Sequence, residues 1–177
     1  MNKSSRLNHP DLSRILVFAL IFTLGFMLTS SFSLQAEEGA FPGEKAPDFT
    51  LTEPDSQEEV SLNQYADDMV LLNFWTTWCP VCGEEMPDLQ QIEDEYEDEA
   101  IVLTVNIGES ASEISSYMEE GGYDFTVLMD DDQETAGLYM VRGVPTTFIL
   151  DDENNTILER HVGPMSYEQK LELLELN

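Results

Sequence analysis

The two cysteines of this 177-residue chain, Cys79 and Cys82, are separated by two residues and directly follow the apolar run 69–74 and a Trp-Thr-Thr-Trp sequence. A strand that leads into such a pair, with a helical pattern after it, places the first sulfur at a helix N-terminus. There the free N–H groups and the positive end of the helix dipole favour the thiolate. Pro80 suits the first helical turn because that position needs no N–H. The pattern is typical of a redox nucleophile with a resolving partner.

Two other uses of the cysteine pair are weaker. A structural disulfide that closes so small a loop would constrain the unfolded chain little. A structural metal site needs about four ligands, whereas the chain has two Cys and two His, and His9 lies before the apolar N-terminal segment. We therefore expect no metal, and no cofactor beyond a redox-active Cys79–Cys82 disulfide.

Residues 1–36 have the pattern of an export signal. A basic head with Lys3, Arg6 and Arg14 precedes an apolar run that begins at Ile15 and weakens towards Leu34. Read through Leu34, the run is long enough to span a bilayer, which favours a retained single-pass anchor in the cell membrane. Small residues before position 37 leave a cleaved signal peptide, and a secreted or periplasmic protein, as the alternative. Both readings place the rest of the chain on the extracytoplasmic side.

The chain is strongly acidic, with 36 Asp and Glu against 7 Lys and Arg and a formal net charge of −29. The acids are spread over every segment after residue 36, which argues against a disordered acidic tail. The composition disfavours a nucleic-acid-binding function because no basic footprint exists. Two interpretations stay open: a solvated surface adapted to high salt, and a surface that steers a basic protein partner.

The elements that position the cysteines form one domain, 46–177, after a short tether at 37–45. A polar turn at 52–59 between two short extended segments predicts a small hairpin. Apolar runs predict strands at 69–74, 101–106, 125–129, 146–150 and 156–162. Periodicity and capping signals predict helices after Cys79, with Pro87 inside it, from Ser110 to Gly121, from Asp131 to Tyr139, and after Ser166. This order predicts an α/β fold with a central mixed sheet flanked by helices.

The chain resembles the thioredoxin superfamily and, within it, the membrane-anchored extracytoplasmic thiol–disulfide oxidoreductases of the TlpA/ResA type. The matching motifs occur in family order across about residues 44–165: Ala46-Pro47-Asp48-Phe49, Trp75 to Cys82, Glu85-Met86-Pro87, Val105 to Glu109, and Gly143 to Phe148. The resemblance implies a thioredoxin-like fold with an N-terminal β-hairpin extension. It also implies an enzyme, a thiol–disulfide oxidoreductase of the protein-disulfide reductase type.

The resemblance assigns Cys79 as the nucleophile and Cys82 as the buried resolving thiol. It implies that Pro145 is cis and packs beside the pair, with the backbone of Val144 available to bind a substrate chain. Trp78 and Pro80, on either side of Cys79, are further candidates for substrate contact. Trp75 and Trp78 could also serve only as packing residues beside the site.

Two glutamates are candidates for proton transfer. Glu85 stands where ResA-like proteins carry a glutamate close to the cysteines, thought to assist proton transfer; its alternative is a solvated acid of the first helical turn. Glu109 is a possible second proton relay, or merely precedes the Ser110 cap. Gly83-Glu84 replaces a basic pair of ResA, and Pro80-Val81 replaces Glu-Pro. Acids without a nearby Lys should disfavour the Cys79 thiolate, which leaves the direction of electron flow open.

We expect the enzyme to reduce disulfides in exported proteins. Apocytochrome c, during cytochrome c maturation, is the leading client by resemblance, and a membrane-embedded thiol-transferring partner must return the electrons. One alternative is a peroxiredoxin-like peroxidase, which shares the Pro-Asp-Phe-Thr-Leu opening but needs a Pro-x-x-x-Thr-x-x-Cys motif that this chain lacks. The other is a non-catalytic copper-binding module or metallochaperone, for which only His161 could add a ligand.

Overall fold

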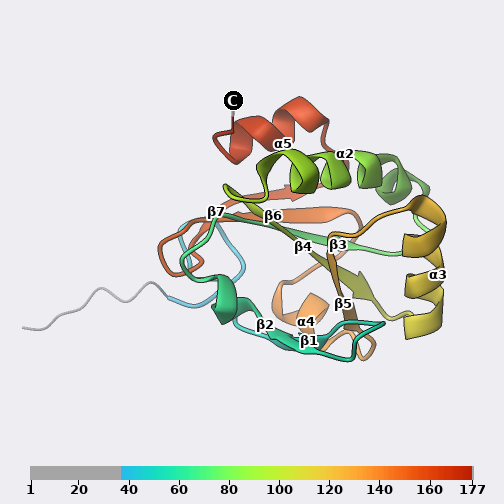
Figure 1. Cartoon of the computed structure of the whole chain (residues 1–177). Helices are drawn as coiled ribbons and strands as arrows, with labels where there is room; N and C mark the ends of the chain where they lie inside the picture. The colour runs from blue at the N-terminus through green and yellow to red at the C-terminus, as the bar shows by residue number, and fades with distance from the viewer. Residues whose placement is uncertain (1–36, 177) are drawn as a thin grey trace, which may run out of the picture. The chain divides into compact units, whose positions relative to one another are not determined.

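The computed structural model describes residues 37–176. The predicted signal or anchor segment, 1–36, lies outside the described residues. Within the described residues, no helix is both long enough and apolar enough to cross a membrane. A seven-stranded sheet in the order β2-β1-β5-β4-β3-β6-β7 forms the centre of this part of the chain (Figure 1).

The sheet is mixed, as predicted. Its central strands β3, β4 and β5 run parallel, while β6 and β7 on one side and β1 and β2 on the other pair antiparallel. The strands are β1 (Thr50–Thr52), β2 (Glu59–Ser61), β3 (Val70–Trp75), β4 (Ile101–Ile107), β5 (Thr126–Asp130), β6 (Thr146–Leu150) and β7 (Ile157–Val162). β3 is buried along its whole length, as expected for an apolar strand covered on both faces. The predicted N-terminal hairpin is the β1–β2 pair.

Helices cover both faces of the sheet. They are η1 (Leu62–Tyr65), α2 (Pro80–Tyr96), α3 (Ala111–Gly121), α4 (Glu134–Leu138) and α5 (Tyr167–Leu173). One core cluster joins α2, α3 and α5 to the sheet through side chains such as Met86, Ile114 and Leu174. The cluster on the other face contains Phe49, Tyr139 and Phe148, and joins the N-terminal segment and α4 to the sheet. Figure 1 shows that α5 lies beside α2. This contact places side chains of α5 next to the helix that begins at the cysteine pair.

Local capping signals predicted most helix ends. Ser110 and Ser166 both form capping boxes, and Gly122 ends α3 in the left-handed region with φ 69°. The predicted start of α4 at Asp131 is wrong. The helix begins at Glu134, and Asp130 rather than Asp131 caps its first turn. The buried Asp130 carboxylate accepts hydrogen bonds from the N–H groups of Thr135 and Ala136 at 3.0 and 2.8 Å. Since β5 ends at Asp130, this residue points inward while Asp131 is exposed.

The segment 37–45, expected as a tether, is held to the domain. The N–H of Gly43 donates to the Ile157 carbonyl at 2.8 Å, and the N–H of Ile157 donates to the Glu44 carbonyl at 2.9 Å. Ala40 is fully buried in the core. The exposed edge of β7 offers unpaired backbone groups, and the segment satisfies them. The domain therefore includes this segment.

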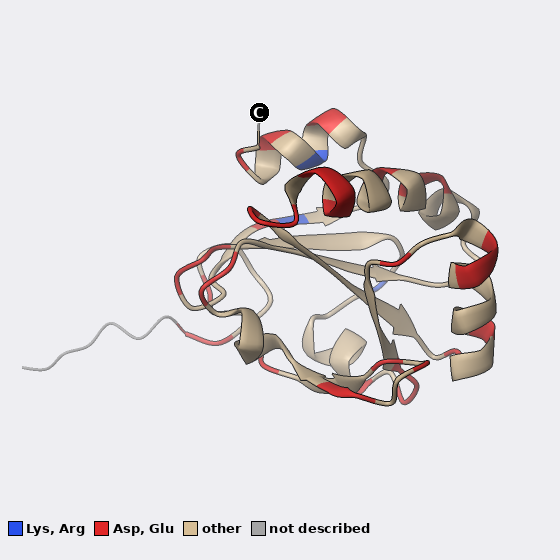
Figure 2. Cartoon of the chain, viewed as in Figure 1, with Lys and Arg blue, Asp and Glu red and all other residues tan. Residues whose placement is uncertain are grey.

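Acidic side chains are distributed over the described surface. Figure 2 shows them on α2, α3, α5, the hairpin and the connecting loops, with few basic residues among them. Of the described cations, Lys170 is fully buried and Arg160 lies over the rings of Phe41 and Phe148 at 5.6 and 5.4 Å. The negative charge is therefore a property of the whole domain rather than of one patch.

Candidate active site

Cys79 and Cys82 form a disulfide at the start of α2. Cys79 is the N-cap residue of the helix, and its Sγ accepts a hydrogen bond from the backbone N–H of Cys82 at 3.2 Å. That N–H has no partner within the helix, so after reduction it stabilises negative charge on the Cys79 sulfur. Cys82 is buried in the core cluster beneath α2. Cys79 belongs to the same cluster and is 5% exposed, but it lines the groove described below, whereas Cys82 does not. An attacking and a resolving thiol require this difference in access.

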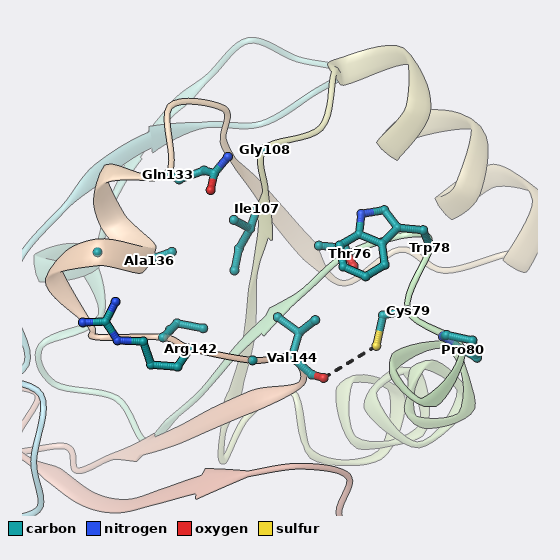
Figure 3. A pocket seen from close by; sticks show the side chains of 13 residues that line it. Thr76, Trp78, Cys79, Pro80, Ile107, Gly108, Gln133, Ala136, Arg142 and Val144 are labelled. Carbon is teal, nitrogen blue, oxygen red and sulfur yellow. Dashed lines mark hydrogen bonds between the residues drawn. The ribbon is translucent and has the colours of Figure 1, made fainter.

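A cis peptide bond lies directly beside Cys79. The Val144–Pro145 bond is cis, as predicted, and the carbonyl oxygen of Val144 is 3.8 Å from Cys79 Sγ (Figure 3). Pro145 is buried, and its carbonyl accepts a hydrogen bond from the N–H of Gly163 at 2.9 Å. The segment before β6 is thereby fixed against β7 on one side and faces the nucleophilic sulfur on the other.

A groove of about 700 Å³ opens next to Cys79. Trp78, Cys79 and Pro80 form one wall, and Val144 with the α4–β6 segment lies opposite (Figure 3). The Trp78 side chain is 71% exposed, whereas Trp75 is fully buried and packs against Tyr117 with ring centroids 5.2 Å apart. The structure thus separates the two tryptophans: Trp75 is a packing residue, and Trp78 lies at the surface of the groove.

The groove contains residues that were not among the site candidates from the sequence. Ile107 comes from the end of β4, Gln133 from the start of α4, and Arg142 from the segment before the cis peptide. Arg142 is exposed and makes no ion pair with the described residues. Ile107 lies in the motif Val105 to Glu109, but no local pattern marks Gln133 or Arg142, because these residues come together only when β4, α4 and the segment before β6 meet. Their position after the parallel strand β4 could have suggested them, since sites form at the carboxyl ends of such strands.

Glu109 does not line the groove. Its carboxylate accepts hydrogen bonds from the backbone N–H of Thr77 at 2.7 Å, from the Thr77 hydroxyl, and from Asn106 Nδ2 at 2.8 Å. Both oxygens are therefore engaged in holding the loop before Cys79 against the end of β4. This geometry favours a positioning role for Glu109 over the proton relay predicted from the sequence.

Glu85 is buried, with 3% of its surface exposed, so the alternative of a solvated first-turn acid is wrong. Its Oε1 accepts a hydrogen bond from the backbone N–H of Met165 at 2.7 Å and lies 3.2 Å from Lys170 Nζ. The expectation that no Lys is near this acidic flank is also wrong, because Lys170 approaches from α5. Sequence reasoning missed Lys170, although its spacing to Tyr167 and Leu174 places it on the inward face of that helix.

No group of three or more His, Cys, Asp or Glu side chains within residues 37–176 is arranged to hold a metal ion. His161 lies in β7 opposite Thr147 on β6.

Comparisons with known proteins place this geometry in a family. Residues 42–158 match the model of the AhpC/TSA family. The chain is 37% identical to the thioredoxin-like protein YneN of Bacillus subtilis over 92% of this chain and 96% of the relative. It is 30% identical to the thiol–disulfide oxidoreductase ResA of Geobacillus thermodenitrificans over 99% of this chain and 98% of ResA. The crystal structure of the exposed lipoprotein thioredoxin of Streptococcus pneumoniae is 32% identical, with a TM-score of 0.62, over 73% of this chain and 98% of that one.

Proposed function

Since the chain belongs to the AhpC/TSA family, and within it to the ResA-type thiol–disulfide oxidoreductases, we propose that it reduces disulfides of exported proteins outside the cytoplasm. The observation that carries the proposal is the position of Cys79. Its sulfur caps α2, borders the groove, and lies 3.8 Å from the carbonyl of Val144 in a cis Val–Pro bond. This combination presents one activated sulfur to an extended client chain.

The reaction is two successive thiol–disulfide exchanges. The Cys79 thiolate attacks one sulfur of the client disulfide, forms a mixed disulfide, and releases the other client sulfur as a thiolate. The Cys82 thiol then loses its proton, and its thiolate attacks Cys79 Sγ. The second client thiolate leaves, the client has gained two electrons, and Cys79–Cys82 is oxidised. The disulfide in the structure is the product state of this cycle.

The groove supports binding of an extended client segment. The backbone of Val144 is next to Cys79 and offers hydrogen-bonding groups to a client main chain, while Trp78 and Pro80 offer exposed apolar surface. Exposed aromatic residues are frequent anchors in protein recognition. We therefore assign these residues to client binding, with Arg142 as the cation at the same groove.

We further propose apocytochrome c as the client and a membrane-embedded thiol-transferring protein as the electron donor. Similarity to ResA supports the client, because haem attachment requires the two thiols of a Cys-x-x-Cys-His motif in reduced form. The basic and apolar pattern of residues 1–36 supports a membrane location. The likeness to an exposed lipoprotein thioredoxin supports placement of the domain outside the cytoplasm.

A trapping experiment tests the proposed function. Cys82→Ser leaves Cys79 able to attack but unable to be released, so it should accumulate a mixed disulfide with its client in cells. The double variant C79S/C82S is the matched control and should trap nothing. Absence of any exported protein bound to the C82S variant would refute the proposal, and identification of the trapped protein tests the apocytochrome c assignment.

The peroxidase alternative is disfavoured by one residue. Thr76 precedes Cys79 by three residues, as the peroxidase motif requires, but Leu72 stands at the position of its proline. Leu72 is fully buried in the middle of β3, where a proline would remove a ladder hydrogen bond. Consumption of hydrogen peroxide at a rate comparable to disulfide reduction would reverse this assignment.

A further inference from the structure

We propose that Lys170 of the C-terminal helix α5 is a positioning residue for the second half of the reaction. In this proposal it holds Glu85 as a carboxylate, one helical turn beyond Cys82, so that Glu85 can accept the proton of the Cys82 thiol. The inference rests on the proposed reductase function and assigns Lys170 a role in its second exchange. Lys170 itself contacts neither cysteine.

The contact between the two residues is buried. The Lys170 side chain has no exposed surface, and the Glu85 side chain is 4% exposed. Lys170 Nζ lies 3.2 Å from Glu85 Oε1, lies 3.1 Å from Asp88 Oδ2, and donates to the Met165 carbonyl at 2.7 Å. The ammonium donates two hydrogen bonds, to Asp88 and to the Met165 carbonyl, and forms an ion pair with Glu85, so its place is fixed relative to α2.

Glu85 has one oxygen free to take a proton. Oε1 is held by Lys170 and by the Met165 N–H, whereas the buried Oε2 has no hydrogen-bond partner among the described residues. Residues three apart on a helix lie on the same face, so Glu85 and the buried Cys82 are neighbours along α2. A buried carboxylate oxygen without a hydrogen-bond donor costs free energy, and such groups are rare in native proteins. A role in proton transfer would account for this one.

Lys170 is the cation that pairs with the buried Glu85 carboxylate. Removing one partner of such a pair leaves the other as an uncompensated buried charge. Lys170 and the Met165 N–H contact Glu85 from the α5 side. On α2 itself, Asp88 contacts the same ammonium, and Cys82 lies one helical turn before Glu85. Glu84 is exposed, and the sheet beneath α2 contributes apolar side chains such as Leu71 and Ile149. Lys170 is therefore the cation placed to compensate the Glu85 carboxylate.

The proton balance of the step is complete within the site. The Cys82 proton moves to Glu85, the Cys82 thiolate bonds to Cys79 Sγ, and the bond from Cys79 to the client sulfur breaks. The client leaves as a thiolate, and Glu85 returns its proton to the leaving thiolate or to water. The client disulfide is reduced by two electrons, and the Cys79–Cys82 dithiol is oxidised by two, as in the overall exchange.

The test separates the two exchanges with dipyridyl disulfide and the reduced full-length chain. Attack by Cys79 releases one pyridinethione, and attack by Cys82 on Cys79 Sγ releases a second. At high probe concentration the first release is fast, so stopped-flow absorbance reports the second as a separate first-order phase, which is followed across pH.

Lys170→Met should leave the first phase within about twofold of the wild type and move the pH midpoint of the second phase upward by about one to three pH units. K170R keeps the charge and should restore the wild-type midpoint. E85Q should slow the second phase by about a hundredfold or more, and K170M should add nothing on that background. The inference is overturned if K170M keeps the wild-type pH midpoint of the second phase. It is also overturned if K170M slows the second phase equally in the wild-type and E85Q backgrounds.

Asp88→Asn provides a second test should K170M fail to fold, because Asp88 is partly exposed. Without the Asp88 carboxylate, the Lys170 ammonium pairs only with Glu85. The pH midpoint of the second phase should therefore fall. An unchanged or raised midpoint in D88N contradicts the inference. Loss of the first phase in the wild type would instead contradict the reductase function, so the two failures are distinguishable.

Discussion

Lys170 Nζ lies 3.2 Å from Glu85 Oε1, and the pair joins the last helix of the chain to the helix that carries both cysteines. Both side chains are buried, so the ion pair belongs to the core between α2 and α5. In a domain with so few cations, one of them is committed to this contact. α5 is therefore part of the redox site and does more than close the fold.

Removal of the Lys170 charge should destabilise the protein. K170M leaves a buried carboxylate without its partner, and such a loss costs about 3–5 kcal/mol. The double variant E85Q/K170M leaves no fully buried unpaired charge, because Asp88 is partly exposed, and should recover much of that loss. Urea unfolding measures both, with K45M as the control for a Lys outside the ion pair. Equal stability of K170M and the wild type would contradict the burial of this pair.

The exposed Trp78 should contribute to client binding and little to stability. Trp78→Ala should lower kcat/KM for a protein disulfide by about tenfold or more, with the free energy of unfolding within about 0.5 kcal/mol of the wild type. Leu158→Ala is a matched control, because Leu158 is exposed and lies outside the groove. A W78A variant with full activity towards protein clients would show that the groove is not the binding surface.

Glu109 should act through the loop that precedes Cys79. Glu109→Gln removes one of the acceptors that hold the Thr77 N–H, the Thr77 hydroxyl and Asn106, and should cost about 1–3 kcal/mol of stability. The first exchange, attack by Cys79, should slow, while the second keeps its pH midpoint. Glu120→Gln on the exposed surface of α3 is the control. A shifted midpoint of the second exchange in E109Q would support the proton relay instead.

Burial raises the pKa of Asp130, although the N–H groups of Thr135 and Ala136 partly offset the shift. The folded protein therefore binds this proton more tightly than the unfolded chain does. The stabilisation is complete below the unfolded pKa and is lost as pH rises through the folded one. The stability of the wild type relative to Asp130→Asn should fall as pH rises from acid to neutral, as urea unfolding can measure. A difference that is flat or rises with pH contradicts this sign.

Local patterns predicted much of the fold. The apolar run before Cys79, the capping boxes of Ser110 and Ser166, and the apolar spacing of α2 all act over a few residues, and each formed where expected. The cis state of Pro145 followed from family resemblance rather than from any local preference. Contacts between distant segments were not predictable, because one sequence position does not specify its partner across the core. Lys170 with Glu85, Glu109 with Thr77, and the attachment of 37–45 to β7 are of this kind.

The reduction potential of Cys79–Cys82 tests the central claim most directly. It is measured by equilibrating the protein with defined redox buffers and following the fraction of disulfide. Thiol–disulfide oxidoreductases range from about −270 mV for thioredoxin to about −120 mV for the oxidant DsbA. If the protein reduces exported proteins, its reduction potential should lie close to the reducing end of that range, about −270 mV. A value near the oxidising end would contradict the proposed direction of electron flow and make this protein a donor of disulfides.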